Sequence, residues 1–253
     1  MKFLVYIGLI VSTISYAQKN LVLDLATVDS KFDVSKYYYT ALESIHGNLP
    51  KEHKNLSRRT GASKFETMRP IFVKDTLYSV SKDNTPFSLV ESYVLSDVKS
   101  YNIYGYVYSI GFKPKNDTVA KINDLYLNEL VMIEKPEKNK MVFLVGSTTV
   151  PNEESNQIKN KDLIDQLILN LSSKYGKVKS YKSTITEYML YDWEFKNHVL
   201  RIIPSGYNVG RINQPTKKYL ELQIMVVNKK YIPELKSLKH PYVTGFAIDF
   251  SMY

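Results

Sequence analysis

The sequence predicts an α+β fold with a mainly antiparallel sheet and one well-defined amphipathic helix, at about 161–175, packed on a β-meander. Two observations lead to this prediction. Apolar side chains recur with helical spacing up to Gly176, and from Thr184 onward they alternate with polar side chains as in a strand with one buried face. A helix laid across the inner face of such a meander buries both apolar surfaces at once.

The helix is predicted by its apolar face and by its two ends. Leu163, Leu167 and Leu171 recur at i, i+4 and i+8, so they share one face. Asn160 is suited to cap the N-terminus, because its side chain accepts a hydrogen bond from a free N–H of the first turn. Gly176 follows the last apolar position, where a left-handed residue ends a helix without a Cβ penalty.

Three strands are expected after the helix. Within 185–195 the odd-numbered residues are largely apolar and the even-numbered ones largely polar, which predicts one buried and one solvated face. A short apolar run begins at Val199 and is expected to end at Pro204. Residues 205–216 are rich in Gly, Asn and Pro and predict a loop, and the alternation over 220–226 predicts the last of the three strands.

The remainder of the chain is also rich in strand patterns. Residues 117–133 fit either a helix, through the spacing of Val119, Ile122 and Leu125, or a strand. No repeat of 20–50 residues with matching side chains is present, although 101–150 and 184–228 are both strand-rich. Further strands are predicted at 71–80, 87–95, 101–113 and 141–148.

The N-terminus has the pattern of a signal peptide. Lys2 is followed by an apolar run over 3–14, which is too short to span a bilayer, and small residues then occupy Ser15 and Ala17. We therefore expect residues 1–17 to be removed before Gln18. The exported part, 18–253, is expected to be one α+β domain, with a division into 18–98 and 99–253 as the alternative.

The composition of the chain limits which cellular compartment and which binding partners are expected. The chain has no Cys, which in an exported protein of this size favours a bacterial envelope or secreted protein and excludes Cys nucleophiles and Cys-based metal sites. The sequence has no second long apolar run, so no transmembrane helix is expected after the signal peptide. The formal net charge is +9. In an exported protein such a charge favours anionic glycans or lipid head groups over nucleic acid, although a solvated basic surface is the simpler explanation, because the lysines are spread along the chain.

Tyrosine is the most unusual component, with 21 Tyr against one Trp. A tyrosine ring suits stacking on sugars and protein interfaces, because it is flat and apolar with a polar tip. Tyr104, Tyr106 and Tyr108 share one face of the strand predicted at 101–113, so they are the best candidates for a binding surface. The competing interpretation is that these rings cover the edge of a core.

Catalytic patterns are weak. Asp192 and Glu194 point to the same side of one strand with Cα atoms about 6.6 Å apart, and His198 lies across the next turn. Paired carboxylates can cleave glycosides, but the same pattern is common on a solvated polar face. The sequence has no metal-ligand spacing of His, no nucleotide-binding glycine motif and no nucleophile elbow, so no metal, cofactor or catalytic residue is assigned.

These observations favour an exported, non-enzymatic binding or interaction protein of the bacterial envelope, periplasmic or secreted, with a glycan or a protein as partner. Two alternatives remain open. One is a hydrolase of an envelope polymer that uses Asp192, Glu194 and His198. The other is a structural subunit of an envelope assembly, which would leave an apolar patch exposed on the monomer.

Overall fold

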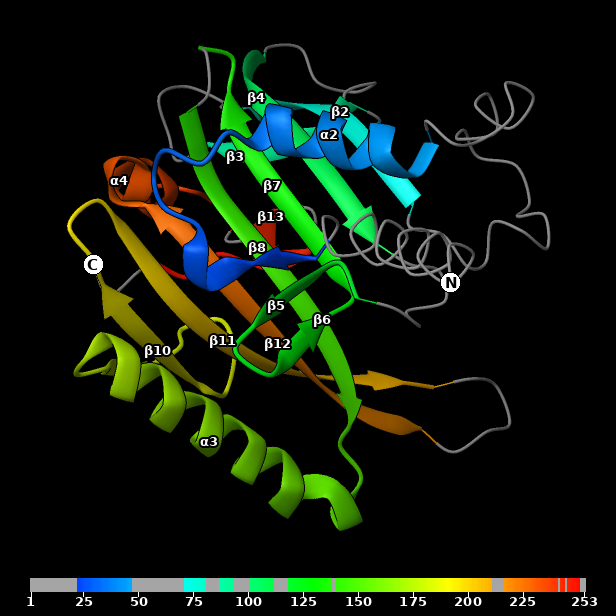
Figure 1. Cartoon of the computed structure of the whole chain (residues 1–253), viewed down its shortest axis with the longest axis vertical. Coiled ribbons are helices and arrows are strands. Elements are labelled where there is room, and N and C mark those ends of the chain that lie inside the picture. The colour runs from blue at the N-terminus through cyan, green and yellow to red at the C-terminus, as the bar shows by residue number, and fades with distance from the viewer. Residues whose placement is uncertain are drawn as a thin grey trace, which may run out of the picture.

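The computed structural model describes residues 22–46, 71–80, 87–92, 101–111, 118–137, 140–210, 216–240, 242–243 and 245–250. The predicted signal peptide, 1–17, lies outside these residues. Figure 1 shows how the helices and strands are arranged. The helices are α2 (Val34–His46), α3 (Gln157–Tyr175) and α4 (Ile232–Lys236), and the 3-10 turns are η1 (Leu25–Thr27), η5 (Glu154–Asn156) and η6 (Lys229–Tyr231). The strands are β1 (Leu23–Asp24), β2 (Ile71–Val80), β3 (Ser88–Glu91), β4 (Asn102–Gly111), β5 (Ala120–Ile122), β6 (Leu125–Leu127), β7 (Glu129–Lys135), β8 (Lys140–Pro151), β9 (Lys179–Lys182), β10 (Met189–Glu194), β11 (His198–Val209), β12 (Lys217–Asn228), β13 (Tyr242–Val243) and β14 (Phe246–Ala247).

One nine-stranded sheet forms the centre of the molecule and confirms the predicted α+β class. Its strand order is β3-β2-β4-β7-β8-β12-β11-β10-β9, and every neighbouring pair is antiparallel. Strands β2 and β4, which lie on either side of the alternative domain boundary at residue 98, pair with each other in this sheet. Both outer strands have only four residues, which limits the backbone that an edge presents to another chain.

The two halves of the sheet have the same order of elements. In each half a helix precedes four neighbouring antiparallel strands: α2 precedes β2, β4, β7 and β8, and α3 precedes β9 to β12. The last strands of the halves, β8 and β12, pair antiparallel in the middle of the sheet, with Ser147 opposite Gln223. Since α2 and α3 also lie on the same face, the halves are related by an approximate two-fold rotation (Figure 1). The strand-rich stretches 101–150 and 184–228 occupy equivalent places.

Both faces of the sheet are covered. On one face Leu167 and Leu171 of α3 join Val34 and Tyr38 of α2 in a single core, as the amphipathic helix predicts. On the other face the C-terminal segment, which contains α4, β13 and β14, packs on a second core. The even-numbered residues of β10 face this second core. The expectation of a solvated polar face there is therefore wrong for Asp192, which is fully buried.

The main helix α3 ends where the sequence predicts but begins at a different residue. Gly176 has a φ of +85° and its N–H donates to the carbonyl of Ser172, so the predicted left-handed stop is confirmed. The helix begins earlier than predicted, at Gln157, directly after η5. Asn160 is not the cap. Its side chain is buried and donates to the carbonyl oxygen of Pro151, at 2.8 Å, and to Asn152.

One expectation about a loop is corrected, and one open alternative is decided. Strand β11 continues through Pro204. Its pairing with β10 ends at Ile202, so at Pro204 the strand has a neighbour, β12, on one side only. The missing N–H of a proline is tolerated at such a position. Residues 205–209 of the predicted loop are therefore part of β11, and residues 211–215 lie outside the described residues. Within 117–133 the structure has β5, β6 and part of β7 in place of a helix, with Asn123 at a φ of +49° in the turn between β5 and β6.

A β-bulge divides the predicted tyrosine face. Leu77 pairs with Gly105 and Tyr78 pairs with Ile103, so Tyr104 is the extra residue on β4. Tyr104 turns to the core under the C-terminal segment, whereas Tyr106 and Tyr108 turn to the helix-covered face. The prediction that the three rings share one face is therefore wrong, because the bulge breaks the two-residue period.

Gly105 is the residue that permits this bulge. A Cβ atom at Gly105 would overlap the carbonyl oxygen of Glu134 on the neighbouring strand. We expect Gly105→Ala to lower the free energy of unfolding by about 1–3 kcal/mol, because the backbone must shift to relieve the overlap. Urea unfolding followed by circular dichroism measures the change.

Gly111 provides the matched control on the same strand. A Cβ there would lie 3.5 Å from Cγ of Glu129, which is an ordinary contact. We expect Gly111→Ala to change the free energy of unfolding by no more than about 0.5 kcal/mol. Equal effects of the two substitutions would contradict the role assigned to Gly105.

Candidate functional site

The first group of candidate residues, around Asp192, is a closed buried network. The Asp192 carboxylate accepts two hydrogen bonds from the Arg201 guanidinium, at 2.6 and 2.7 Å, and a third from the Tyr181 hydroxyl at 2.7 Å. Asp192 and Arg201 pair across β10 and β11 and are 0% and 1% exposed. This geometry engages both carboxylate oxygens in charge-assisted hydrogen bonds and leaves the group no access to a substrate.

The same guanidinium binds the C-terminal segment. It donates to the backbone carbonyl of Asp249 and lies over the ring of Phe250, 4.5 Å from the ring centroid. The Asp249 carboxylate in turn accepts hydrogen bonds from the Ser183 hydroxyl and from the backbone N–H of Thr184. The network therefore joins three strands to the segment that covers the sheet, which is a structural role.

Glu194 and His198 do not complete a catalytic group with Asp192. Glu194 forms ion pairs with Lys179 at 2.6 Å and Lys229 at 3.3 Å. The hydrogen bond from Lys179 lowers the pKa of Glu194, so this carboxyl favours the ionised form and is poorly suited to act as an acid. His198 faces the opposite side of the sheet, where it lines a pocket with Leu200. The structure thus places His198 on the other face of the sheet from Asp192 and Glu194, and both carboxylates are engaged in ion pairs.

The tyrosine candidates also occupy different surroundings. Tyr108 is buried and its hydroxyl donates to Glu134 at 2.7 Å, and burial together with this bond raises the Tyr108 pKa. Tyr104 is buried under the ammonium of Lys135, which lies 3.4 Å from its ring centroid. Tyr106 is half-buried and is the most accessible of the three.

A cation lies among tyrosine rings beside Tyr106. The Lys74 ammonium is 5.5, 5.0 and 5.4 Å from the ring centroids of Tyr39, Tyr106 and Tyr108 and donates to the Tyr39 hydroxyl at 2.9 Å. Lys74 and Tyr39 are exposed. Within the described part of the chain Lys74 forms no ion pair. We call Lys74, Tyr39, Tyr106 and Tyr108 the tyrosine–lysine cluster. It can offer ring faces and a charge to a ligand at once.

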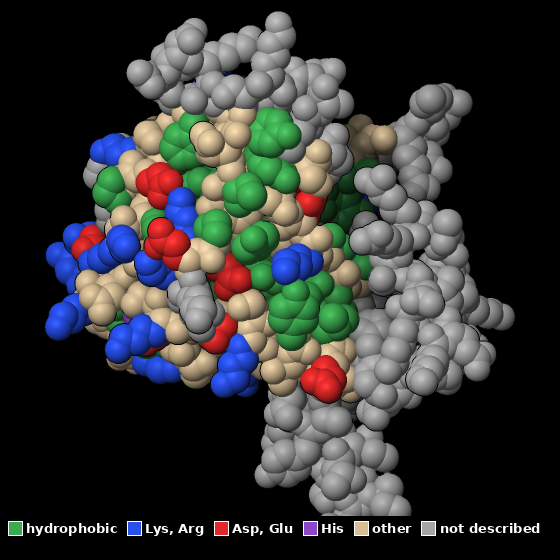
Figure 2. Space-filling model, turned by 90° about the horizontal axis from the view of Figure 1, so that it is seen from above, with side chains coloured by type: hydrophobic (Ala, Val, Ile, Leu, Met, Phe, Trp, Pro, Cys, Tyr) green, Lys and Arg blue, Asp and Glu red, His purple; other side chains and the backbone are tan. Residues whose placement is uncertain are grey.

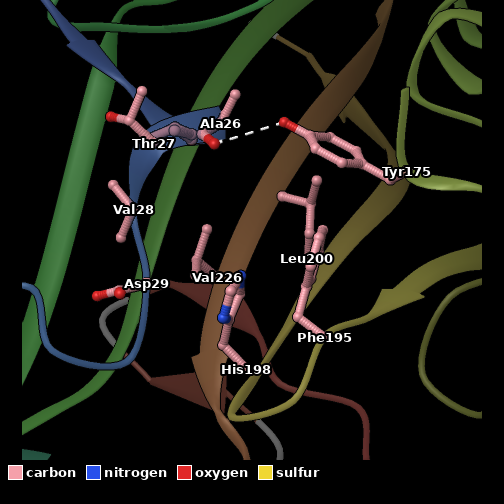
Figure 3. A pocket seen from close by; sticks show the side chains of 10 residues that line it. Ala26, Thr27, Val28, Asp29, Tyr175, Phe195, His198, Leu200 and Val226 are labelled. Atoms are coloured by element: carbon pink, nitrogen blue, oxygen red, sulfur yellow. Dashed lines mark hydrogen bonds between the residues drawn. The ribbon is translucent and has the colours of Figure 1, made fainter.

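A pocket of about 140 Å³ lies on the helix-covered side of the sheet. Figure 3 shows it between the segment from Ala26 to Asp29 on one side and Tyr175, Phe195 and His198 on the other. The rings of Phe195 and His198 stack in parallel, with centroids 4.4 Å apart. Burial lowers the pKa of His198, and the nearby Asp29 only partly opposes this, so the imidazole favours its neutral form.

No group of three or more His, Asp or Glu side chains among the described residues is arranged to hold a metal ion. No helix in the described ranges is long and apolar enough to cross a membrane. Comparisons with protein-family models, with curated proteins and with solved structures found no match.

Sequence reasoning missed Arg201, Lys74 and Tyr39. A signal existed for Arg201, because it is the only charged residue in the apolar run from Val199 to Ile203 and a buried charge requires a partner. The tyrosine–lysine cluster had no such signal. Its members come from α2, β2 and β4 and meet only in the folded chain.

The buried network makes a specific prediction about stability. We expect Arg201→Met to lower the free energy of unfolding by about 3–5 kcal/mol, because it leaves the Asp192 carboxylate buried without its counter-ion. Chemical denaturation measures the loss. Lys179→Met removes the exposed partner of Glu194 and is the control, with an expected loss of about 0–1 kcal/mol.

The double variant Arg201→Met with Asp192→Leu separates charge from packing. It removes the uncompensated charge and should be more stable than Arg201→Met alone. A double variant that is less stable than the single one would show that packing of the guanidinium, and not its charge, holds the segment.

Proposed function

We propose that this chain is an exported protein of the bacterial envelope that binds an anionic glycan and does not act as an enzyme. The observation that carries the proposal is the tyrosine–lysine cluster, in which an exposed ammonium is held among tyrosine rings. A sugar ring can lie on the exposed faces of Tyr39 and Tyr106 while its carboxylate or phosphate pairs with Lys74. An ammonium has three N–H donors, and Tyr39 occupies one of them.

The charge distribution supports a defined site over a general basic surface. The chain carries 34 Lys and Arg against 25 Asp and Glu, so anions are attracted over long range. Figure 2 shows basic and acidic side chains interspersed on one part of the surface and hydrophobic side chains, tyrosine included, gathered on another. Retention of an anionic polymer should therefore depend on a cation placed beside aromatic rings and less on net charge.

The separation of Asp192, Glu194 and His198 favours binding over hydrolysis. A glycosidase needs two carboxylates that face one substrate, and here one is fully paired in the interior. The proposal of a hydrolase based on these residues therefore has less support than the proposal of a binding protein.

Export is tested by the mass of the protein made in a bacterium with a C-terminal tag. We expect the protein recovered from the envelope or the medium to begin at Gln18. Ala17→Arg places a large charged residue at the cleavage position and should yield an unprocessed chain. Recovery of the wild-type chain in the cytoplasm at its full length of 253 residues would contradict export.

Glycan binding is tested with residues 18–253 on immobilised polygalacturonate, alginate and a polyglycerol phosphate, with dextran as the uncharged reference. We expect retention on at least one anionic polymer at moderate salt. Lys74→Met should weaken it about tenfold or more, because one charge-assisted hydrogen bond contributes about 1.5–3 kcal/mol. Tyr106→Ala should also weaken retention, and it should lower the melting temperature as well, because part of the ring packs against the core.

Lys182→Met is the control, because it removes the same charge from an exposed position on the edge strand β9. We expect it to leave retention unchanged. Equal losses in the Lys74 and Lys182 variants, or retention that vanishes at moderate salt, would indicate only a basic surface. Failure to bind any anionic polymer would favour a protein partner instead.

A further inference from the structure

The pocket beside His198 has an apolar floor, and its volume suits a small ligand. Its floor consists of four buried aliphatic side chains, and its rim carries the exposed residues Thr27 and Asp29. The volume of about 140 Å³ is close to that of an apolar protein cavity, about 150 Å³, that accepts benzene. A single six-membered ring therefore matches the space. The floor residues are Leu25, Val28, Leu200 and Val226.

The walls favour a flat ligand. Phe195 and His198 stack with an angle of 9° between their planes and present a continuous aromatic edge. Tyr175, from the end of α3, adds a third ring, and its hydroxyl donates to the carbonyl oxygen of Ala26 at 3.4 Å (Figure 3). This long hydrogen bond links α3 to η1 and keeps the two sides of the pocket at a set spacing.

The polar groups of the pocket favour a neutral ligand with a hydrogen-bonding group. A neutral imidazole has one N–H donor and one acceptor nitrogen, and among the described residues the His198 side chain has no hydrogen-bond partner. A hydroxyl group can both donate to and accept from such a ring. Asp29 at the rim and Lys229 near His198 carry opposite charges, so the pocket offers no net charge to an ionic ligand.

We infer that this pocket binds one aromatic ring that carries a hydroxyl or amino group, that is, a phenol or an aniline. The ring would rest on the aliphatic floor beside the Phe195–His198 stack, and its polar substituent would bond His198. The pocket is lined by η1 and the two residues after it, the end of α3, the turn at Phe195, β11 and β12, and it shares no residue with the tyrosine–lysine cluster. This inference therefore does not rest on the glycan proposal.

The chain contains a natural reporter for this site. Trp193 is the only tryptophan, and it pairs across the strands with Leu200, a residue of the pocket floor. Titration of residues 18–253 with phenol, followed by Trp193 fluorescence and by ligand-detected NMR, should give a Kd of about 0.1–1 mM. Benzene lacks the polar group and should bind at least about fivefold more weakly, and benzoate should not compete.

Two substitutions locate the binding. Ala26→Leu fills part of the pocket and should weaken phenol binding about tenfold. His198→Phe keeps the stacked ring but removes both nitrogens, so phenol should then bind no better than benzene. His240→Phe makes the same change at an exposed position and should leave phenol binding unaltered.

Several results would overturn the inference. The inference is wrong if phenol changes neither signal at about 10 mM, if benzene and phenol bind equally well to the wild type, or if Ala26→Leu leaves the phenol affinity intact. If Ala26→Leu does not fold, the comparison of His198→Phe with His240→Phe decides the question. Equal phenol binding by these two variants contradicts the assigned role of His198.

Discussion

The buried guanidinium of Arg201 is the constraint on which much of this structure depends. Removing a cation from water costs several kcal/mol, so a folded chain must supply counter-charge and hydrogen bonds at that point. Asp192 supplies the charge from the adjacent strand, and the backbone carbonyl of Asp249 supplies a further acceptor from the C-terminal segment. The segment is thereby attached to the sheet at a polar point, while Phe246 and Ile248 add apolar contacts around it. A conformation with this segment elsewhere would leave Arg201 paired with Asp192 but without the carbonyl acceptor of Asp249.

Covering both faces of the sheet decides which surfaces remain for function. The two helices and the β1, β5 and β6 strands cover one face, and the C-terminal segment covers the other. Candidate sites are consequently found where these layers end. The tyrosine–lysine cluster includes Tyr39 of α2, and the pocket lies between η1 and the end of α3 (Figure 3). The cluster belongs to the half of the sheet that follows α2, whereas the pocket combines η1 with α3, β11 and β12 of the other half.

The interior and the surface use charged and aromatic residues in different ways. Asp192 and Arg201 satisfy each other and have no spare capacity for a ligand. Lys74 and Tyr106 lie at or near the surface, where a ligand can compete for their contacts. The same residue types therefore serve stability in one place and favour binding in the other, and only their burial distinguishes the two roles.

The sequence alone determined the elements whose signals are local. The spacing of Leu163, Leu167 and Leu171 with Gly176 behind them specified the main helix, because helical period and a left-handed stop depend on neighbouring residues only. Tertiary structure decided what depends on distant partners. The bulge turns the ring of Tyr104 to the opposite face of the sheet from Tyr106. The bulge arises in the pairing of β4 with β2, so the alternation of residues within β4 does not reveal it. The burial of Asp192 was likewise decided by a segment more than fifty residues away, since a polar face is solvated only if nothing covers it.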